Sequence, residues 1–339
     1  MTTRREFVAT SSAGLAGLGL APLMSRSPGA LLSTARATGT GFVFEERSLA
    51  HVLPPRRGEP HPERPLRLRR IHEELTARGL IDDMTRLAPR DDVMTYIRGH
   101  HTATHVDAIE QIEITGPIAE LAVGGALTAV DAVANGDVAN AFCAIRPPGH
   151  HANNTGAEEG FCFYSNAAIA AKYAQSVHGL EKVLIIDWDY HHGNGTQNAF
   201  YDDPSVLFFS AHDWEAYPQT GDPSLVGEGD GRGLNINVHL ECGSKNADML
   251  SYWDGKLDTA VSSFRPDLVL ISAGFDSRQD DLLGCFDLTD EAFRVMTRRT
   301  MDYAESCCDG KVVSLLEGGY NVDGLALATA AHVETLLGN

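Results

Sequence analysis

Four short apolar runs each pass directly into polar or ionisable residues, and this pattern constrains the fold of the chain most. The runs AFCAI, VLII, LVLIS and VVSLL lie at residues 141–145, 183–186, 268–272 and 312–316. Segments with the 3.6-residue apolar period of helices alternate with them. Continuous apolar strands alternating with helices indicate a three-layer α/β fold, in which helices cover both faces of a parallel sheet. The helical segments are 66–80, 118–134, 167–177, 252–263 and 292–306, and further strands are expected at 206–210 and 235–240.

The polar residues that follow these runs are expected to meet at one edge of the sheet. The carboxyl ends of parallel strands share an edge, and ligands bind in the crevice beyond it. The four runs lead into RPPGHH, DWDYHH, AGFD and EGGYN. A single acidic residue after a strand is more often a helix cap. Four such strand ends at one edge instead indicate an active site.

One strand end, DWDYHH, has the composition of a metal site. Side chains alternate in extended chain, so Asp187, Asp189 and His191 are expected to share one side. Two carboxylates that lie close together out of water repel each other, and burial beside an imidazole adds a desolvation cost. A positive charge among the three groups would offset both effects. A divalent metal ion would supply that charge. A salt-bridged structural cluster is the alternative, although no Lys or Arg lies nearby in the sequence.

Six motifs along the chain resemble those of the zinc-dependent histone deacetylase and acetylpolyamine amidohydrolase family, closest to its class II and bacterial members. The resemblance covers roughly residues 41–330 and implies an arginase-like fold around a mostly parallel eight-stranded sheet. Residues 38–339 would form one catalytic domain. The chain lacks the paired DxHxD clusters of the arginases themselves. The matching motifs are HPERP (61–65), RPPGHHA (146–152), GFCFYSNAAIAA (160–171), DWDYHHGNGTQ (187–197), SAGFDS (272–277) and LEGGYN (316–321).

The resemblance implies a metal-dependent hydrolysis of an amide. Asp189, His191 and Asp276 would bind the metal, which is zinc in most relatives and could be iron(II), because the ligand set does not separate the two. Asp187, Asp189 and Ser210 resemble the family's buried monovalent cation site, which usually holds potassium.

The tandem histidines of RPPGHHA would be catalytic. Asp187 would hydrogen-bond His150, and Asn194 would hydrogen-bond His151; asparagine at position 194 is the class II pattern. A carboxylate raises the pKa of a histidine far more than a neutral amide does. His151 is therefore expected to be the general base and His150 to stay protonated. Tyr320 would donate its hydroxyl to the oxyanion, and Ser210 has no partner base by motif.

The substrate pocket is expected to be a narrow tunnel for an alkyl chain that ends in an amide. Gly160 and Phe161 resemble one wall and Tyr217 the opposite wall. Polyamine deacetylases of this type have Glu seven residues after the metal-binding Asp, where this chain has Leu283. Leucine at this position favours acetyl-lysine substrates. Acetylpolyamines and small acetamides stay open, since Asp280 and Asp281 could receive a cation.

Two other classes of function are weighed against a deacetylase. One is a metal-dependent hydrolase of a different carbon–nitrogen bond on the same fold. The other is an inactive metal-binding module, which the tandem histidines and Tyr320 disfavour because metal storage needs neither. The oligomeric state is not readable from the sequence.

The first 37 residues resemble a twin-arginine export signal. An arginine pair at 4–5 precedes a Gly/Ala-rich apolar stretch at 8–24 and an A-x-A cleavage site at 35–37. We expect an exported protein, with no stable membrane span, because the stretch is short and glycine-rich. A disordered N-terminus that stays in the cytoplasm is the alternative. The net charge of -19 disfavours nucleic acid and anionic membranes as partners, and the spacing of the six cysteines predicts no structural disulfide.

Overall fold

An eight-stranded parallel sheet organises the part of the chain that the computed structural model describes, residues 37–56 and 58–338. The strand order is β2-β1-β3-β8-β7-β4-β5-β6, and every neighbouring pair is parallel. The expected α/β class is confirmed, and the sheet is parallel throughout rather than mostly so. The strands are β1 (Thr40–Phe44), β2 (Met84–Leu87), β3 (Asn140–Ala144), β4 (Val183–Asp187), β5 (Val206–His212), β6 (Asn235–His239), β7 (Leu268–Ala273) and β8 (Val312–Leu316).

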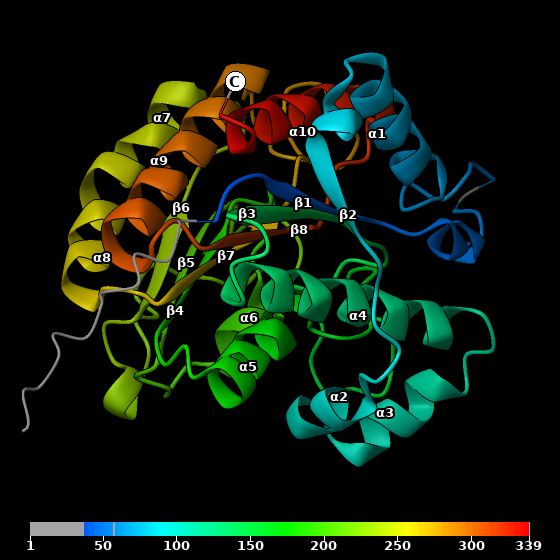
Figure 1. The fold of residues 1–339 in the computed structure, drawn as a ribbon, viewed down its shortest axis with the longest axis horizontal. Coiled ribbons are helices and arrows are strands. Elements are labelled where there is room, and N and C mark those ends of the chain that lie inside the picture. Colours follow the sequence, from blue (N-terminus) through cyan, green and yellow to red (C-terminus); the bar gives the residue numbers. More distant parts are fainter. Residues whose placement is uncertain (1–36, 57, 339) are drawn as a thin grey trace, which may run out of the picture. The chain divides into compact units, whose positions relative to one another are not determined.

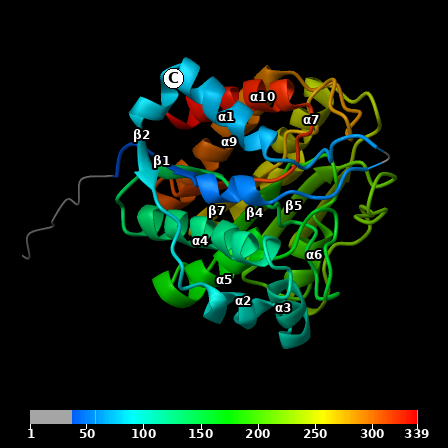
Figure 2. The same ribbon diagram turned by 90° about the vertical axis from the view of Figure 1, so that its right-hand side faces the viewer.

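Helices cover both faces of this sheet. Figure 1 shows α1, α7, α8, α9 and α10 on one side of the strands and α2 to α6 on the other, and Figure 2 shows the same layers from the side. A π-helical turn, Trp253–Leu257, joins α7 to α8. The helices are α1 (Leu66–Ala77), α2 (Met94–His100), α3 (Ala103–Glu110), α4 (Thr115–Ala134), α5 (Asn166–His178), α6 (Asn194–Ala199), α7 (Asn246–Tyr252), α8 (Asp258–Phe264), α9 (Asp290–Cys308) and α10 (Val322–Leu336).

The central strands are apolar throughout because each face of the sheet packs against helices. In β4, Leu184 and Ile186 belong to one core cluster, which contains residues of α9, while Val183 and Ile185 belong to the other, which contains residues of α4 and α5. All four side chains are fully buried. Alternating side chains thus reach both cores, which is why the run VLII shows no polar alternation.

Helix α4 is the one described helix that is long and apolar enough to cross a membrane. Its 20 residues have a mean hydropathy of 1.4 in the relevant window, and 72% of that window is buried inside the fold. It packs against β1, β3 and β8. Its composition is therefore explained by its place as a core helix.

Two strands and several helices were not predicted from the sequence. Strand β2 lies at the edge of the sheet and consists of half-exposed and exposed residues, so it has no apolar run. Strand β1 is fully buried, but its sequence TGFVF begins with a threonine and a glycine, so its apolar run is only three residues long. Helix α10 is apolar almost all round, so it shows little of the period that marked the other helices.

The prediction of no structural disulfide was wrong. Cys242 and Cys285 form a disulfide that joins the loop after β6 to the loop after β7. The two cysteines are 43 residues apart, and only the tertiary fold brings their loops together. The backbone N–H of Gly243 also donates to the carbonyl of Cys285, at 2.7 Å. The free cysteines of the described residues are Cys143, Cys162, Cys307 and Cys308.

The predicted export signal lies, except for Ala37, outside the described residues. It stays a prediction.

A buried ionic cluster fastens the N-terminal part of the domain to the sheet. Arg146, which follows β3, donates two hydrogen bonds of 2.6 Å to the carboxylate of Glu63. Arg67 of α1 lies 3.3 Å from the same carboxylate. All three side chains are fully buried. Burial raises the pKa of Glu63, but Arg146 and the neighbouring cations outweigh it and hold the pKa well below its usual range.

Glu63→Gln should destabilise the fold by about 3–5 kcal/mol at pH 7, because it leaves two buried guanidinium groups without a counter-charge. The pKa of this carboxyl is lower in the folded state than its value of about 4.3 in an unfolded chain. The stabilisation is therefore complete above that pH and declines as the pH falls below it. Urea unfolding at pH 7 and pH 3.5 measures both effects. Glu59→Gln, at an exposed position of the same segment, is the matched control.

The disulfide predicts the number of reactive thiols. Alkylation of the denatured protein without reductant should label four of the six cysteines, and prior reduction should bring the number to six. Cys242→Ser should raise the unreduced count to five, because Cys285 loses its partner. Intact-mass spectrometry gives these counts, and six labels before reduction would contradict the disulfide.

Candidate active site

The four strand ends singled out in the sequence belong to four neighbouring strands. Strands β3, β8, β7 and β4 are consecutive in the sheet, and all run in the same direction. Their carboxyl ends therefore bring His150, Glu317 and Asp276 of the loops that follow, and Asp187 at the end of β4, to one edge. This adjacency is the local reason why so many ionisable groups meet here.

Asp189, His191 and Asp276 form a compact cluster of potential metal ligands. Nδ1 of His191 lies 3.1 Å from Oδ1 of Asp189 and 3.0 Å from Oδ2 of Asp276. One ligand atom from each residue lies within 4.8 Å of the other two. Burial lowers the pKa of His191, but its contacts with the two carboxylates outweigh that and raise it to about 10. Burial and the charge of Asp189 raise the pKa of Asp276 to about 7. The cluster thus strongly favours a positive charge among its members.

This donor set fits a catalytic zinc ion. One imidazole nitrogen and two carboxylate oxygens are ordinary zinc ligands, and a catalytic site keeps a fourth position open. His191 lines the cavity described below, so the cluster opens to it. A second group of potential ligands, His150, Cys162 and Glu317, is fully buried, and only the first group contains a cavity-lining residue.

Two backbone amides orient the carboxylates of the cluster. Gly318 donates to Oδ2 of Asp189 at 2.8 Å, and Tyr190 donates to Oδ1 of Asp276 at 2.9 Å. Gly318 has no room for a side chain, since a Cβ there would lie 2.2 Å from Oδ2 of Asp276 and 2.5 Å from Oδ2 of Asp189. The first glycine of the LEGGYN motif is therefore required, because the carboxylates of both acids approach it closely.

The tandem histidines have the different partners that the sequence suggested. Nδ1 of His150 donates to Oδ2 of Asp187 at 3.0 Å, and Nδ1 of His151 donates to the amide oxygen of Asn194 at 2.8 Å. Burial lowers the pKa of His150, but Asp189 and Asp187 raise it well above the usual value. Burial and the neighbouring His150 hold the pKa of His151 well below it. The two rings therefore favour opposite protonation states.

Glu317 is a buried acid whose part in the site was not foreseen. Its Oε2 accepts hydrogen bonds from the backbone amides of Gly149 and His150, at 2.7 and 3.2 Å, while Oε1 has no hydrogen-bond partner within the described part of the chain. Burial raises its pKa to about 7. It ties the EGGYN loop to the loop that carries the tandem histidines.

Arg67 and Asp281 hold Tyr320 and its loop in place. The sequence suggested no role for Arg67 and a different role for Asp281. The guanidinium of Arg67 lies over its ring at 5.1 Å and donates to the carbonyls of Glu317 and Gly319. Asp281 accepts from the backbone amides of Tyr320 and Asn321, at 2.7 and 3.0 Å. Asp281 does not line the cavity and its carboxylate accepts these backbone amides, so the structure gives no support to the suggestion that it receives a substrate cation. This role of Asp281 in holding Tyr320 could not be predicted from the sequence, because the hydrogen bond joins residues that are 39 positions apart.

A cavity of about 500 Å³ leads to this edge of the sheet. Gly160, Phe161, Tyr217 and Leu283, the four residues predicted to line the substrate tunnel, all line it. The rings of Phe161 and Tyr320 meet edge to face at 5.7 Å, and those of Tyr217 and His151 at 5.0 Å. Gly160 must be a glycine, because its φ is +53° and a Cβ would lie 2.3 Å from the ring of His151. The remaining lining residues are Arg56, His151, Glu158, Glu159, His191, Ala216 and Tyr320.

Ser210 does have a histidine partner, contrary to the reading of the motifs. Its Oγ lies 2.8 Å from Nδ1 of His212, whose Nε2 donates to the carbonyl of Gly221. Both side chains are fully buried and neither lines the cavity. Ser210 also lies directly beside Asp187 in the register of β4 and β5. The pair therefore belongs to the packing under the site and cannot reach a substrate in the cavity.

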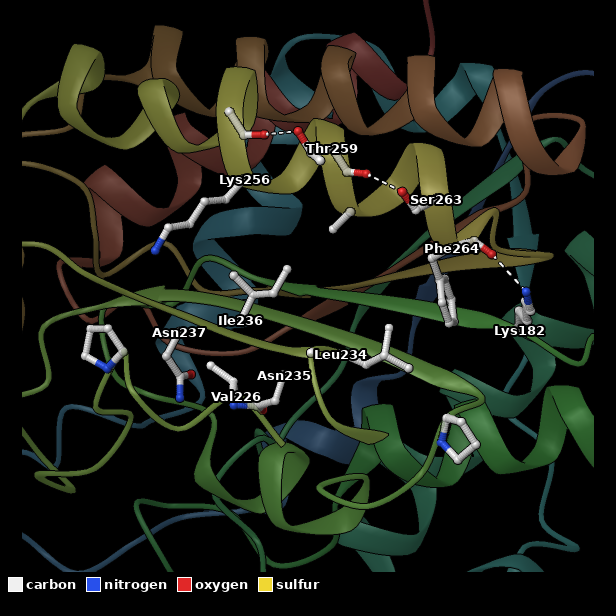
Figure 3. A pocket seen from close by; sticks show the side chains of 15 residues that line it. Lys182, Val226, Leu234, Asn235, Ile236, Asn237, Lys256, Thr259, Ser263 and Phe264 are labelled. Carbon is white, nitrogen blue, oxygen red and sulfur yellow. Dashed lines mark hydrogen bonds between the residues drawn. The ribbon is translucent and has the colours of Figure 1, made fainter. Parts of the chain in front are cut away.

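A larger cavity, of about 1030 Å³, lies at the β6 edge of the sheet and is less suited to chemistry. Figure 3 shows Ile236 and Asn237 of β6 on one side and Lys256, Thr259 and Phe264 on the other. Its described lining contains no carboxylate, imidazole or thiol. The smaller cavity, with its converging acids and histidines, is therefore the candidate active site.

Comparison with known proteins agrees with this geometry. The histone deacetylase domain matches residues 61–336. The chain belongs to the histone deacetylase family. Histone deacetylase 5 of Arabidopsis thaliana is 37% identical over 335 residues, which cover 89% of this chain and 49% of that protein. Polyamine deacetylase HDAC10 of Homo sapiens is 36% identical over 328 residues, which cover 89% of this chain and 48% of that protein. The chain thus spans about half the length of these two relatives.

Among solved structures, the crystal structure of the HDA15 HD domain has the same fold. It superposes with a TM-score of 0.84 at 37% sequence identity, and the match covers 89% of each chain.

Gly318→Ala should lower the affinity of the site for zinc by tenfold or more, without removing a ligand. The new methyl group would displace the carboxylates of Asp189 and Asp276, and disturbance of groups that orient ligands typically costs 10- to 100-fold in affinity. Competition with a chromophoric chelator measures this. Gly99→Ala, where a Cβ meets nothing within 4 Å, is the control. Equal affinity in both variants would contradict the proposed ligand geometry.

Proposed function

We propose that this protein is a zinc-dependent deacetylase, which hydrolyses an acetyl or related acyl group from the amine of a lysine-like side chain. The single observation that carries the proposal is the pair of adjacent histidines with different partners beside the Asp189, His191 and Asp276 cluster, at the base of an aromatic-walled cavity. An acid and a base held next to a metal-binding cluster suit the hydrolysis of an amide.

Asp189, His191 and Asp276 would hold the zinc ion, and iron(II) is an alternative with the same ligands. When bound, the ion would supply Lewis acidity that polarises the acyl carbonyl and lowers the pKa of water. Asp187, Asp189 and Ser210 would hold potassium at a second site. All three side chains are buried, and Asp187 and Ser210 are neighbours in the register of β4 and β5.

The chain's own groups would move the protons. His151 donates through Nδ1 to Asn194, so its Nε2 is free to take a proton from the attacking water. The Tyr320 hydroxyl would donate to the oxyanion as the carbonyl becomes tetrahedral, and burial keeps it protonated by raising its pKa well above the usual value. His150, paired with Asp187, would return a proton to the leaving amine. Phe161 and Tyr217 would align the alkyl chain between them.

The substrate class is an acyl-lysine rather than an acetylpolyamine in this proposal. Leu283 lines the cavity where a polyamine deacetylase would be expected to have a glutamate. The similarity to polyamine deacetylase HDAC10 favours acetylpolyamines as the second candidate. Small acetamides are compatible with the same tunnel. The export signal predicted at residues 1–37 leads us to propose action outside the cytoplasm.

Tyr320→Phe should reduce kcat by about 100- to 1000-fold, the loss typical of one oxyanion-hole donor. The measurement is acetate release from an acetyl-lysine peptide by the zinc-loaded protein, with Asp189→Ala as the blank. Zinc content should be unchanged in Tyr320→Phe, because Tyr320 is not in the ligand cluster. A variant with near-normal kcat would remove Tyr320 from the mechanism.

A further inference from the structure

The mouth of the catalytic cavity carries one cation and one anion against the same aromatic residue. The guanidinium carbon of Arg56 lies 5.2 Å from the centre of the Phe161 ring. Oε1 of Glu158 accepts a hydrogen bond from the backbone amide of Phe161 at 2.7 Å. Both residues line the cavity, and both are exposed. A ligand that emerges along Phe161 therefore meets a positive and a negative group together.

These two charges are open to a ligand. Within the described residues, the guanidinium of Arg56 forms no ion pair, and Glu158 has a hydrogen bond on only one carboxylate oxygen. The neighbouring acids are occupied, since Glu159 accepts from Asn153, and Asp281 accepts from four backbone amides. Among the described residues that line the cavity, Arg56 and Glu158 are thus charged groups for which no ion pair is found.

The position of Phe161 relates these charges to the reacting end of the cavity. Its ring lies 5.7 Å from the ring of Tyr320 at the base and 5.2 Å from the guanidinium carbon of Arg56 at the mouth. An alkyl chain that packs along Phe161, with its amide at Tyr320, would hold its other end close to Arg56 and Glu158.

We propose that the preferred substrate is a free Nε-acyl-lysine, a zwitterionic amino acid whose α-carboxylate pairs with Arg56 and whose α-ammonium pairs with Glu158. The inference rests on the deacetylase function proposed above. Water cleaves the amide carbon–nitrogen bond, so that acetate keeps the oxygen of water and the ε-amine of lysine receives a proton. Both charges of the head group stay unchanged in the reaction.

Other substrates would match this mouth less well. Within a peptide, the α-nitrogen and α-carbonyl are neutral, so Arg56 and Glu158 gain no counter-charge. An acetylpolyamine brings an ammonium group that suits Glu158 but is repelled by Arg56. A free amino acid satisfies both groups at once, and charge-assisted hydrogen bonds are stronger than neutral ones.

The test compares kcat/KM for acetate release by the zinc-loaded protein on four related substrates. These are free Nε-acetyl-L-lysine, its α-carboxamide, 6-acetamidohexanoate, which lacks the α-ammonium, and N8-acetylspermidine. We expect free Nε-acetyl-lysine to exceed each of the other three by about tenfold, mainly through a lower KM, because a hydrogen bond to a charged group is lost in each case.

Two variants test which residue recognises each charge of the substrate. Arg56→Ala should abolish the preference for the carboxylate over the carboxamide, and Glu158→Gln should abolish the preference for Nε-acetyl-lysine over 6-acetamidohexanoate. The matched controls, Arg69→Ala and Glu59→Gln, change the same charges at exposed positions that do not line the cavity, and both preferences should persist.

The outcomes separate this inference from the proposed function. Equal or faster turnover of the carboxamide, or of acetylspermidine, by the wild type overturns the zwitterionic substrate and leaves the deacetylase intact. Unchanged preferences in Arg56→Ala and Glu158→Gln overturn the assignment of these residues. Absence of acetate from all four substrates and from an acetyl-lysine peptide overturns the deacetylase itself, and this inference with it.

Discussion

The need for positive charge among buried carboxylates is the constraint on which the rest of this site depends. Four carboxylates lie fully buried at the carboxyl edge of the sheet: Asp187, Asp189, Asp276 and Glu317. Groups of like charge, so close and out of water, resist ionising together. His150 and His191 supply part of the compensation, yet the pKa values of Asp276 and Glu317 are still raised to about 7. A divalent cation bound by Asp189, His191 and Asp276 would take the place of the proton on His191 and bring more positive charge to these carboxylates.

A second buried charge cluster keeps the loops of the candidate active site in position. Arg67 of α1 connects Glu63 to the carbonyls of Glu317 and Gly319, and Arg146 connects Glu63 to the loop after β3. The HPERP, RPPGHH and LEGGYN segments thus meet in one ionic group although they are far apart in the chain. Tyr320 depends on it, because Arg67 contacts both its ring and the loop that carries it. The buried ionic group of Glu63, Arg67 and Arg146 therefore stabilises the fold and also positions the loops of the candidate site.

The sequence predicted the central sheet and the grouping of Asp189, His191 and Asp276, because both follow from local pattern. Apolar runs that end in ionisable residues are visible in the chain, and parallel pairing brings their ends together. Contacts between distant loops left no such pattern, so the Cys242–Cys285 disulfide and the occupied carboxylate of Asp281 were not foreseen. Edge strand β2 lacks an apolar face and was missed for that reason. The charge pair at the mouth depends on how the loop with Arg56 folds over Phe161.

The most direct test of the account is anomalous diffraction at the zinc edge from crystals of the zinc-loaded protein. We expect one strong peak in contact with Asp189, His191 and Asp276, with the fourth position directed into the cavity that Phe161 and Tyr217 line. A peak held instead by His150, Cys162 and Glu317, or no ordered zinc at this edge of the sheet, would contradict it.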